Sequence, residues 1–280
     1  MADLVYPPVI ALARGVFAAL GLRFTITGTE HVPRTGGAVM VINHVGYLDF
    51  TFAGLGARPA KRLVRFMAKD EVFRHSVSGP LMRGMKHIPV DREAGSASFR
   101  AALTALKAGE IVGVFPEATI SQSFELKDFK SGAARMARSA GVPLLPVIVW
   151  GSQRVWTKGR PRNFGYSRTP IHIAVGAPLD VPPKSDPEAL TAELRERMTA
   201  MLHQVQEAYP GQPRGEDDRW WLPARLGGTA PTPEEAAALD ARDAEERRAR
   251  RAARLAAGQQ GSGAAERGEQ PGDLGPKTGH

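Results

Sequence analysis

Three uninterrupted apolar runs constrain the fold of this chain more than any other feature of its sequence. They read GAVMVIN, EIVGVFP and VPLLPVIVWG, and they begin at Gly37, Glu110 and Val142. Runs without polar alternation are typical of strands that are buried on both faces, as in a parallel or mixed sheet covered by helices. The sequence therefore predicts an α/β domain with a mixed, largely parallel central sheet flanked by helices.

Shorter β-branched stretches alternate with helical ones around these runs, from residue 25 to about residue 210. We expect strands at 24–29, 38–42, 85–90, 111–115, 144–150 and 171–175. We expect helices at 50–55, 76–83, 96–108, 132–140 and 187–209. This alternation defines the main domain as residues 25–210.

The first 24 residues predict an apolar, partly amphipathic helix opened by Pro7 and Pro8. Its apolar run from Val9 to Leu22 is interrupted by Arg14 and is shorter than the roughly 20 residues that span a bilayer. Such a helix can lie on a membrane surface, or it can pack on the domain. No basic segment followed by a cleavage site marks a secretory signal peptide.

Residues 211–280 form a tail of different composition, rich in Gly, Pro, Arg and Glu. Its segment 233–257 has good helix propensity but sparse apolar residues, which predicts a solvated helix or disorder. The tail holds 11 Lys and Arg against 12 Asp and Glu, whereas residues 1–210 hold 26 against 17. The main domain therefore carries the excess positive charge, and its expected partners are anionic.

The chain has no cysteine, which excludes disulfides, thiolate zinc sites and cysteine nucleophiles. No spacing typical of a metal site is present, so we predict no metal. Nor does the sequence contain a pattern typical of nucleic-acid-binding domains, although Trp220 and Trp221 lie side by side. These observations leave a phosphate-bearing ligand or an anionic membrane surface as the expected partner of the basic domain.

A histidine and a carboxylate follow the first apolar run in the sequence INHVGYLDF. His44 lies where a parallel sheet presents ligands, and the turn through Gly46 lets Asp49 fold back onto the imidazole. A histidine so oriented is suited to act as a general base. The alternative is a structural histidine followed by an aspartate that caps the next helix.

Three further stretches carry polar residues beside predicted strand ends. VFPEATISQSFELKDFKSG places Glu117 after a strand, with Lys127 and Lys130 ahead of a helix start. RGMKHIPVDRE ends in Arg92, whose guanidinium can bind a phosphate. AGVPLLPVIVWGS is expected to be mainly core. Taken singly, these residues are better explained as a solvated strand end or a helix cap.

Together, the four stretches resemble the glycerophospholipid acyltransferase family, whose best-known members are 1-acylglycerol-3-phosphate acyltransferases. The resemblance covers about residues 25–180 and matches four blocks in order. These are Asn43-His44 with Asp49, then Gly84 to Arg92, then Phe115-Pro116-Glu117 with Thr119 and Ser121, and then Val142 to Pro146.

The resemblance implies that a lysolipid hydroxyl gives its proton to His44, held by Asp49, and attacks an acyl thioester directly. The donor would be acyl-CoA or acyl-carrier protein, and no cofactor is expected. By the same resemblance, the substrate-binding residues are Asn43, Arg92, Glu117, Thr119 and Lys130. The expected product is phosphatidate, made at the cytoplasmic face of the cell membrane by a peripheral enzyme.

The third block departs from the family pattern F-P-E-G-T-R, because Ala118 and Ile120 replace its glycine and arginine. Isoleucine cannot pair with a phosphate, so either Lys127, Lys130 or Arg92 takes that role or the acceptor differs. Two alternatives therefore stay open. One is an acyltransferase for another lysophospholipid or a glycolipid, and the other is a non-enzymatic lipid-binding protein of the same fold.

Overall fold

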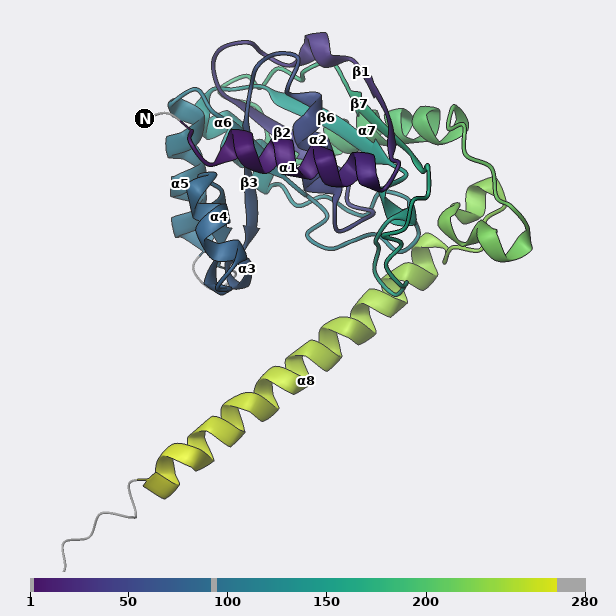
Figure 1. Cartoon of the computed structure of the whole chain (residues 1–280). Coiled ribbons are helices and arrows are strands. Elements are labelled where there is room, and N and C mark those ends of the chain that lie inside the picture. The colour runs from purple at the N-terminus through teal and green to yellow at the C-terminus, as the bar shows by residue number, and fades with distance from the viewer. Residues whose placement is uncertain (1–2, 92–94, 266–280) are drawn as a thin grey trace, which may run out of the picture. The chain divides into compact units, whose positions relative to one another are not determined.

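The computed structural model describes residues 3–91 and 95–265, and residues 3–233 form one compact unit (Figure 1). At its centre lies a seven-stranded sheet in the order β1-β7-β6-β2-β5-β3-β4. Five of the six strand pairings are parallel, and β6 with β7 is antiparallel. The predicted mixed, largely parallel sheet is therefore confirmed. The strands are β1 (Arg23–Thr27), β2 (Ala38–Ile42), β3 (Val64–Lys69), β4 (Ile88–Val90), β5 (Ile111–Val114), β6 (Leu144–Trp150) and β7 (Pro170–Val175).

The helices of this unit connect and cover the strands. They are α1 (Tyr6–Ala19), α2 (Asp49–Gly56), α3 (Asp70–Arg74), α4 (Ser78–Gly84), α5 (Gly95–Lys107), α6 (Gly132–Ala140) and α7 (Pro187–Glu207). Short 3-10 turns lie at Thr29–His31, Ser152–Arg154, Glu216–Trp221 and Ala224–Leu226. A second unit begins at Glu234, within the long helix α8 (Pro233–Ala265). Segment 233–257, for which the sequence allowed a helix or disorder, is therefore helical.

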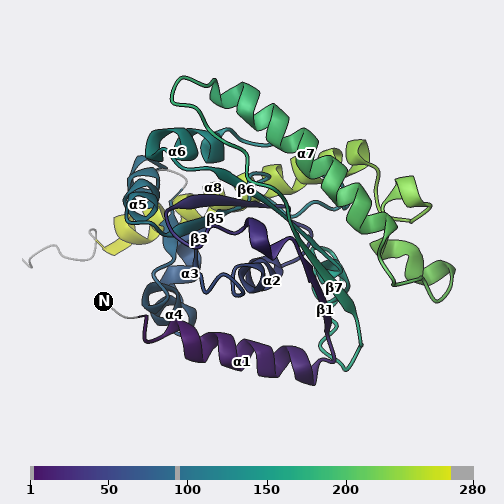
Figure 2. The ribbon, with the colours of Figure 1, turned by 90° about the horizontal axis from the view of Figure 1, so that it is seen from above.

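The sheet is buried on both faces because consecutive side chains of its central strands point in opposite directions. In β2, Val39 and Val41 join the apolar core under α5, α6 and α7. Ala38, Met40 and Ile42 join the core on the other face, with Phe17 of α1 and Phe52 of α2. Figure 2 shows α1 and α2 on one side of the sheet and α6 and α7 on the other. This double coverage explains why the strand sequences show no polar alternation.

Strand β3 and the short helix α3 were not predicted from the sequence. Strand β3 lies between β5 and β4 and reads VRFMAK. The charged residue at its second position interrupts the apolar pattern by which a buried strand is recognised. The Arg65 side chain is 2% exposed, and its guanidinium pairs with the carboxylates of Asp3 and Glu110 at 2.9 and 3.0 Å. These ion pairs allow the Arg65 cation to be buried. Because Asp3 and Glu110 lie far from Arg65 in the sequence, the pairing could not be predicted from it.

Helix α1 packs on the domain through one side and exposes apolar residues on the other. Phe17 and Tyr6 are buried, and the Tyr6 hydroxyl donates a hydrogen bond to the Val64 carbonyl at 2.7 Å. Leu12 and Val16, one turn apart, are 70% and 48% exposed. Among the residues that the structure describes, no helix is long and apolar enough to cross a membrane.

The segment after α7 contributes to the core of the first unit. Trp221 is fully buried, its ring lies 5.6 Å from the Tyr209 ring, and the Arg154 guanidinium lies 4.3 Å from its ring centroid. Arg225 reaches back to bond the side chain of Gln206 on α7. Trp221 and Arg225 thus attach this segment to the end of α7 and to the turn that follows β6.

Asn43 extends the pairing of β2 with β6 beyond the end of β2. Its fully buried side chain accepts a hydrogen bond from the Val149 N–H at 2.7 Å and donates one to the Val149 carbonyl at 3.1 Å. The carboxamide therefore acts as one more peptide unit of the ladder. It fixes the chain direction at the residue immediately before His44.

We predict that Asn43→Ala lowers the free energy of unfolding by about 2–4 kcal/mol, because it leaves the buried N–H and carbonyl of Val149 without partners. Urea unfolding followed by circular dichroism measures this loss. Asn163→Ala, the same substitution at an exposed position, should change stability by no more than about 0.5 kcal/mol. Equal effects of the two substitutions would contradict the ladder role of Asn43.

Candidate active site

The candidate site lies at the carboxyl ends of the three central strands. Strand β2 pairs in parallel with β5 on one side and β6 on the other, so the three ends meet at one edge of the sheet. His44 follows β2, Glu117 follows β5, and Ser152 follows β6. The edge thus brings together residues that lie more than 100 positions apart. Open α/β sheets place their ligand sites at this edge.

Asp49 holds the turn between β2 and α2. It is fully buried, and its Oδ2 accepts hydrogen bonds from the backbone N–H groups of Val45 and Gly46 at 2.7 and 2.8 Å. Oδ2 also lies 3.0 Å from His44 Nδ1, and the Ser152 hydroxyl donates to Oδ1. Asp49 is the first residue of α2, where the helix dipole favours a carboxylate. Asp49 therefore folds back onto His44, as expected from the sequence.

Gly46 is needed for this turn because there is no room for a side chain. A Cβ atom there would lie 2.8 Å from the Ser152 hydroxyl oxygen and 3.0 Å from the Trp156 carbonyl oxygen. The close approach lets Ser152 reach Asp49. Ser152 was not predicted as a site residue from the sequence, because only the pairing of β6 with β2 brings Ser152 to this turn.

The His44 ring is oriented from two sides. Its side chain is 20% exposed, and it lies against the Phe115 ring with the two centroids 4.3 Å apart. Because a carboxylate can only accept, the Asp49 contact selects the tautomer with the proton on Nδ1. Nε2 then presents its lone pair, and it has no hydrogen-bond partner within residues 3–91 and 95–265. The ring is thus arranged to take a proton from a ligand.

Glu117 ties two loops of the site together. It is buried, and its Oε1 accepts a hydrogen bond from the His44 N–H at 2.8 Å, while Oε2 accepts one from the Lys127 N–H at 3.1 Å. Burial raises the pKa of Glu117 to about 8, although the two N–H donors and the Lys127 charge favour the carboxylate. Both side-chain oxygens therefore hold backbone amides of the site.

The loop after Glu117 brings the other predicted ligand-binding residues close to it. Lys127 Nζ lies 2.5 Å from the Thr119 hydroxyl, and the Lys130 N–H donates to the Pro116 carbonyl at 3.1 Å. Lys130 itself is exposed. Thr119, Lys127 and Lys130 thus lie on one loop, folded back over the end of β5.

The two positions at which the sequence departs from the family pattern have distinct structural settings. Ala118 has φ of 61°, in the left-handed region that glycine adopts without strain. Alanine adopts this conformation here at a cost of about 1 kcal/mol. The Ile120 side chain is only 5% exposed. This position therefore holds a buried apolar side chain where the family pattern has an arginine.

Two of the predicted ligand-binding residues, Asn43 and Arg92, are not seen among the ligand-binding side chains of the site. The Asn43 side chain is buried and forms both of its hydrogen bonds with the Val149 backbone, so its role is to position His44. Arg92 lies outside the residues that the structure describes. The contact of Phe115 with the imidazole could not be predicted from the sequence, where its one distinguishing feature is its place in the Phe-Pro-Glu block.

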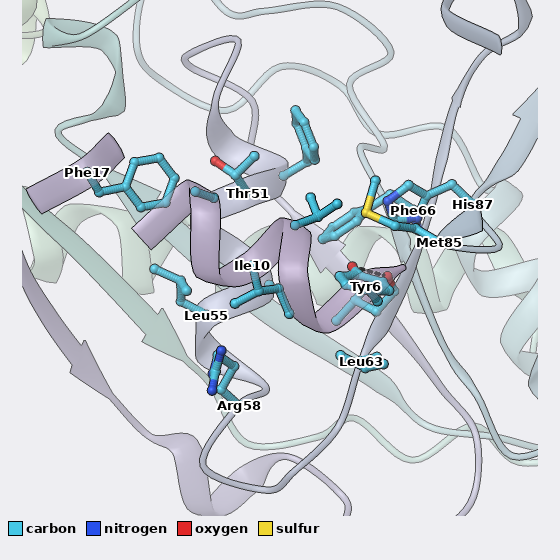
Figure 3. Close-up of a pocket in the computed structure, with 15 residues that line it drawn as sticks. Tyr6, Ile10, Phe17, Thr51, Leu55, Arg58, Leu63, Phe66, Met85 and His87 are labelled. Atoms are coloured by element: carbon cyan, nitrogen blue, oxygen red, sulfur yellow. Dashed lines mark hydrogen bonds between the residues drawn. The ribbon is translucent and has the colours of Figure 1, made fainter. Parts of the chain in front are cut away.

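An apolar cavity lies between α1, α2 and β3 (Figure 3). Helix α2 borders it through Phe50, Thr51, Gly54 and Leu55, in the turns that follow Asp49. The rest of the wall comes from α1 and from the region of β3 and β4, and it includes Tyr6, Val9, Ile10, Ala13, Phe17, Arg58, Leu63, Val64, Phe66, Met85 and His87. Helix α2, which begins at Asp49, therefore also lines the apolar cavity.

Comparison with known proteins relates this geometry to a family. The family model described as Acyltransferase matches residues 23–150, a range that includes His44, Asp49 and Glu117. The 1-acyl-sn-glycerol-3-phosphate acyltransferase of Bacillus subtilis is 30% identical over 182 residues, covering 64% of this chain and 87% of its own. The enzyme of the same name from Borreliella burgdorferi is 27% identical over 193 residues, covering 66% and 74%.

The same fold occurs in a solved structure, the 1-acyl-sn-glycerophosphate acyltransferase PlsC of Thermotoga maritima. It superposes with a TM-score of 0.60 at 22% identity, covering 73% of this chain and 80% of its own. The match of sequence, fold and residue order agrees with the resemblance drawn from the four sequence blocks. The chain belongs to the glycerophospholipid acyltransferase family and is an acyltransferase of the 1-acylglycerol-3-phosphate acyltransferase type.

Proposed function

We propose that the protein transfers a fatty acyl group from an acyl thioester to the free hydroxyl of 1-acylglycerol-3-phosphate, giving phosphatidate. The observation that carries this proposal is the His44–Asp49 pair, with Nε2 open, in a chain related to enzymes named for this acceptor. We propose acyl-CoA or acyl-carrier protein as the donor and a reaction without a cofactor. Another lysophospholipid or a glycolipid is the competing acceptor.

In the proposed reaction, the acceptor oxygen attacks the thioester carbonyl carbon while its proton passes to His44 Nε2. Asp49 holds the tautomer and stabilises the imidazolium that forms. The tetrahedral intermediate then breaks its carbon–sulfur bond, and the leaving thiolate takes the proton from His44. The acyl group ends as an ester, and the histidine returns to its starting state.

The acceptor phosphate is proposed to bind at the loop after Glu117. Ile120 cannot supply a charge, but Lys127 and Lys130 lie on the same loop as Thr119. Glu117 holds the Lys127 backbone and the His44 backbone at once, so it sets the distance between the base and the phosphate site. Arg92 is retained as a further phosphate ligand in this proposal.

The apolar cavity beside α2 is proposed to receive the acyl chain of the donor. Its walls are mostly apolar, and the carboxylate that orients the base lies on α2, which borders the cavity. An acyl chain bound there gains about 0.8 kcal/mol for each buried methylene. A peripheral position at the cytoplasmic face of the membrane, with the exposed Leu12 and Val16 of α1 in the lipid interface, supplies the lipid substrate.

Replacing His44 by alanine is expected to lower kcat by about 10²–10⁴-fold, the usual contribution of a positioned base. The assay supplies 1-acylglycerol-3-phosphate with a long-chain acyl-CoA or acyl-carrier protein and measures thiol release and phosphatidate mass. His75→Ala, at an exposed histidine, serves as the control and should retain activity. Undiminished turnover by His44→Ala would rule out the proposed base.

The raised pKa of Glu117 predicts a pH dependence of stability. The folded state binds this proton more tightly than the unfolded chain, whose glutamate titrates near its usual value. The resulting stabilisation is complete below the unfolded pKa and is lost as pH rises through about 8. Glu117→Gln should therefore show a smaller decrease in unfolding free energy between pH 5 and pH 9 than the unmodified protein.

This difference is measured by urea unfolding across the pH range. Glu216→Gln, at a side chain that is 85% exposed, is the matched control and should leave the pH profile unchanged. Parallel profiles for the unmodified protein and Glu117→Gln would show that Glu117 is not buried with a raised pKa.

Filling the cavity should shorten the preferred acyl chain. A Cβ atom at Gly54 would lie 3.7 Å from the Phe66 ring, an ordinary contact, so a larger side chain there projects into the cavity without striking the backbone. We expect Gly54→Leu to lower kcat/KM for long acyl donors at least about 10-fold more than for short ones. Gly132→Leu, in an open position of α6, should leave the chain-length profile unchanged.

A further inference from the structure

One surface segment beside the site has a composition that the proposed chemistry does not use. Residues 156–168 read WTKGRPRNFGYSR and contain four basic residues, three aromatic residues and no acidic residue. We call this segment the basic aromatic loop. It connects the region that follows β6 with the start of β7.

Several aromatic side chains gather beside the turn between β2 and α2, residues 43–48, which we call the catalytic turn. The centroid of the Trp156 ring lies 4.6 Å from that of the Tyr47 ring and 5.8 Å from that of the Phe164 ring. Tyr47 is 42% exposed, Phe164 is 48% exposed, and Tyr166 is 71% exposed. Exposed aromatic residues gathered in one region mark an interaction surface.

The arginines of the loop are held with their hydrogen-bonding edges available. The Arg162 guanidinium lies 4.3 Å from the Trp156 ring centroid, and that of Arg160 lies 5.0 Å from the Trp220 ring centroid. Stacking occupies the flat face of a guanidinium and leaves its N–H edge for a phosphate. Across the described ranges, neither of these arginines nor Arg168 forms an ion pair. No carboxylate of the described residues therefore neutralises these three charges, and they are available to an anionic ligand.

Hydrogen bonds fasten the loop to the catalytic turn at one end. The Tyr47 N–H donates to the Trp156 carbonyl at 3.0 Å, and the Thr157 hydroxyl donates to the Val45 carbonyl at 2.7 Å. Any partner bound to the loop is thereby held at a fixed position relative to His44.

The other end of the loop is fastened to the end of α1. The Ser167 N–H donates to the Leu20 carbonyl at 3.0 Å. The Tyr166 ring packs on Gly21, where a Cβ atom would lie 2.7 Å from it. The loop therefore continues the surface of α1, whose outer side exposes Leu12 and Val16.

We propose that the basic aromatic loop docks the protein on an anionic bilayer, with its arginines on lipid phosphates and Phe164 and Tyr166 at the level of the headgroups. Amphipathic aromatic rings favour that level, and basic residues are drawn to anionic lipid. The adjoining apolar surface of α1 selects a bilayer over an acidic protein, because a folded acidic partner satisfies the arginines but not exposed leucine and valine. The inference rests on the proposed function, since a lysolipid acceptor resides in a bilayer.

The test measures binding of the full chain to sedimented vesicles, without substrates. One set is phosphatidylcholine alone, and the other is phosphatidylcholine with phosphatidylglycerol. The triple variant Arg160→Glu/Arg162→Glu/Arg168→Glu should bind the anionic vesicles at least about 100-fold less tightly. Each basic residue near such a surface contributes roughly fivefold, and the three new carboxylates are repelled by it. Phe164→Ala/Tyr166→Ala should weaken binding to both vesicle types.

The matched control reverses three exposed cations on the opposite face of the sheet, as Arg100→Glu/Lys107→Glu/Lys184→Glu. It makes the same change in net charge and should reduce vesicle binding much less. Equal losses for both triple variants, or unchanged binding of the loop variant, would overturn the inference.

Turnover on a short-chain lysophosphatidate, dissolved below its micelle concentration, separates docking from chemistry. The loop variants should retain activity on this acceptor while losing it on vesicles. A loss confined to reactions with acyl-carrier protein, with vesicle binding intact, would instead assign the loop to an acidic protein and contradict bilayer docking. If the unmodified protein turned over no lysophosphatidate but the loop still controlled vesicle binding, the proposed function would fail and the docking inference would stand.

Discussion

The parallel pairing of β2 with β5 on one side and with β6 on the other is the constraint on which the rest of the structure depends. It gathers three carboxyl ends at one edge, and each end delivers one residue of the site. His44, Glu117 and Ser152 meet there although the segments between them are long. The pairing is stable because helices cover both faces of the sheet, which keeps its apolar side chains from water.

The buried carboxylate of Asp49 organises the turn that carries His44. Four donors surround it: two backbone amides, the His44 ring and the Ser152 hydroxyl. A charge removed from water needs such compensation, and here the compensating groups are the ones that shape the turn. The same bonds that make the carboxylate tolerable therefore fix the direction of the imidazole. Stability and catalytic geometry arise from one set of contacts.

In the proposed function, different parts of the chain bind different parts of the substrate. The loop of Thr119, Lys127 and Lys130 offers charge, the cavity beside α2 offers an apolar wall, and the surface of α1 with the basic aromatic loop faces outward. An amphiphilic substrate has matching parts: a phosphate, an acyl chain and a bilayer that holds it. The departure at Ile120 is consistent with this proposal, because the isoleucine is buried while Lys127 and Lys130 on the same loop carry positive charge.

The sequence by itself determined the fold class, most of the strands and helices, and the pairing of His44 with Asp49, because these depend on local patterns of apolar residues and on a five-residue interval. It failed at β3, where Arg65 is accepted inside the fold through partners remote in the sequence. Tertiary structure alone decided the order of the strands, and with it the contact of Ser152 with Asp49, the role of Glu117 in holding two amides, and the commitment of Asn43 to Val149. The physical reason is that strand order follows from how helices bury both faces of the sheet, a global balance of apolar area that no short segment encodes.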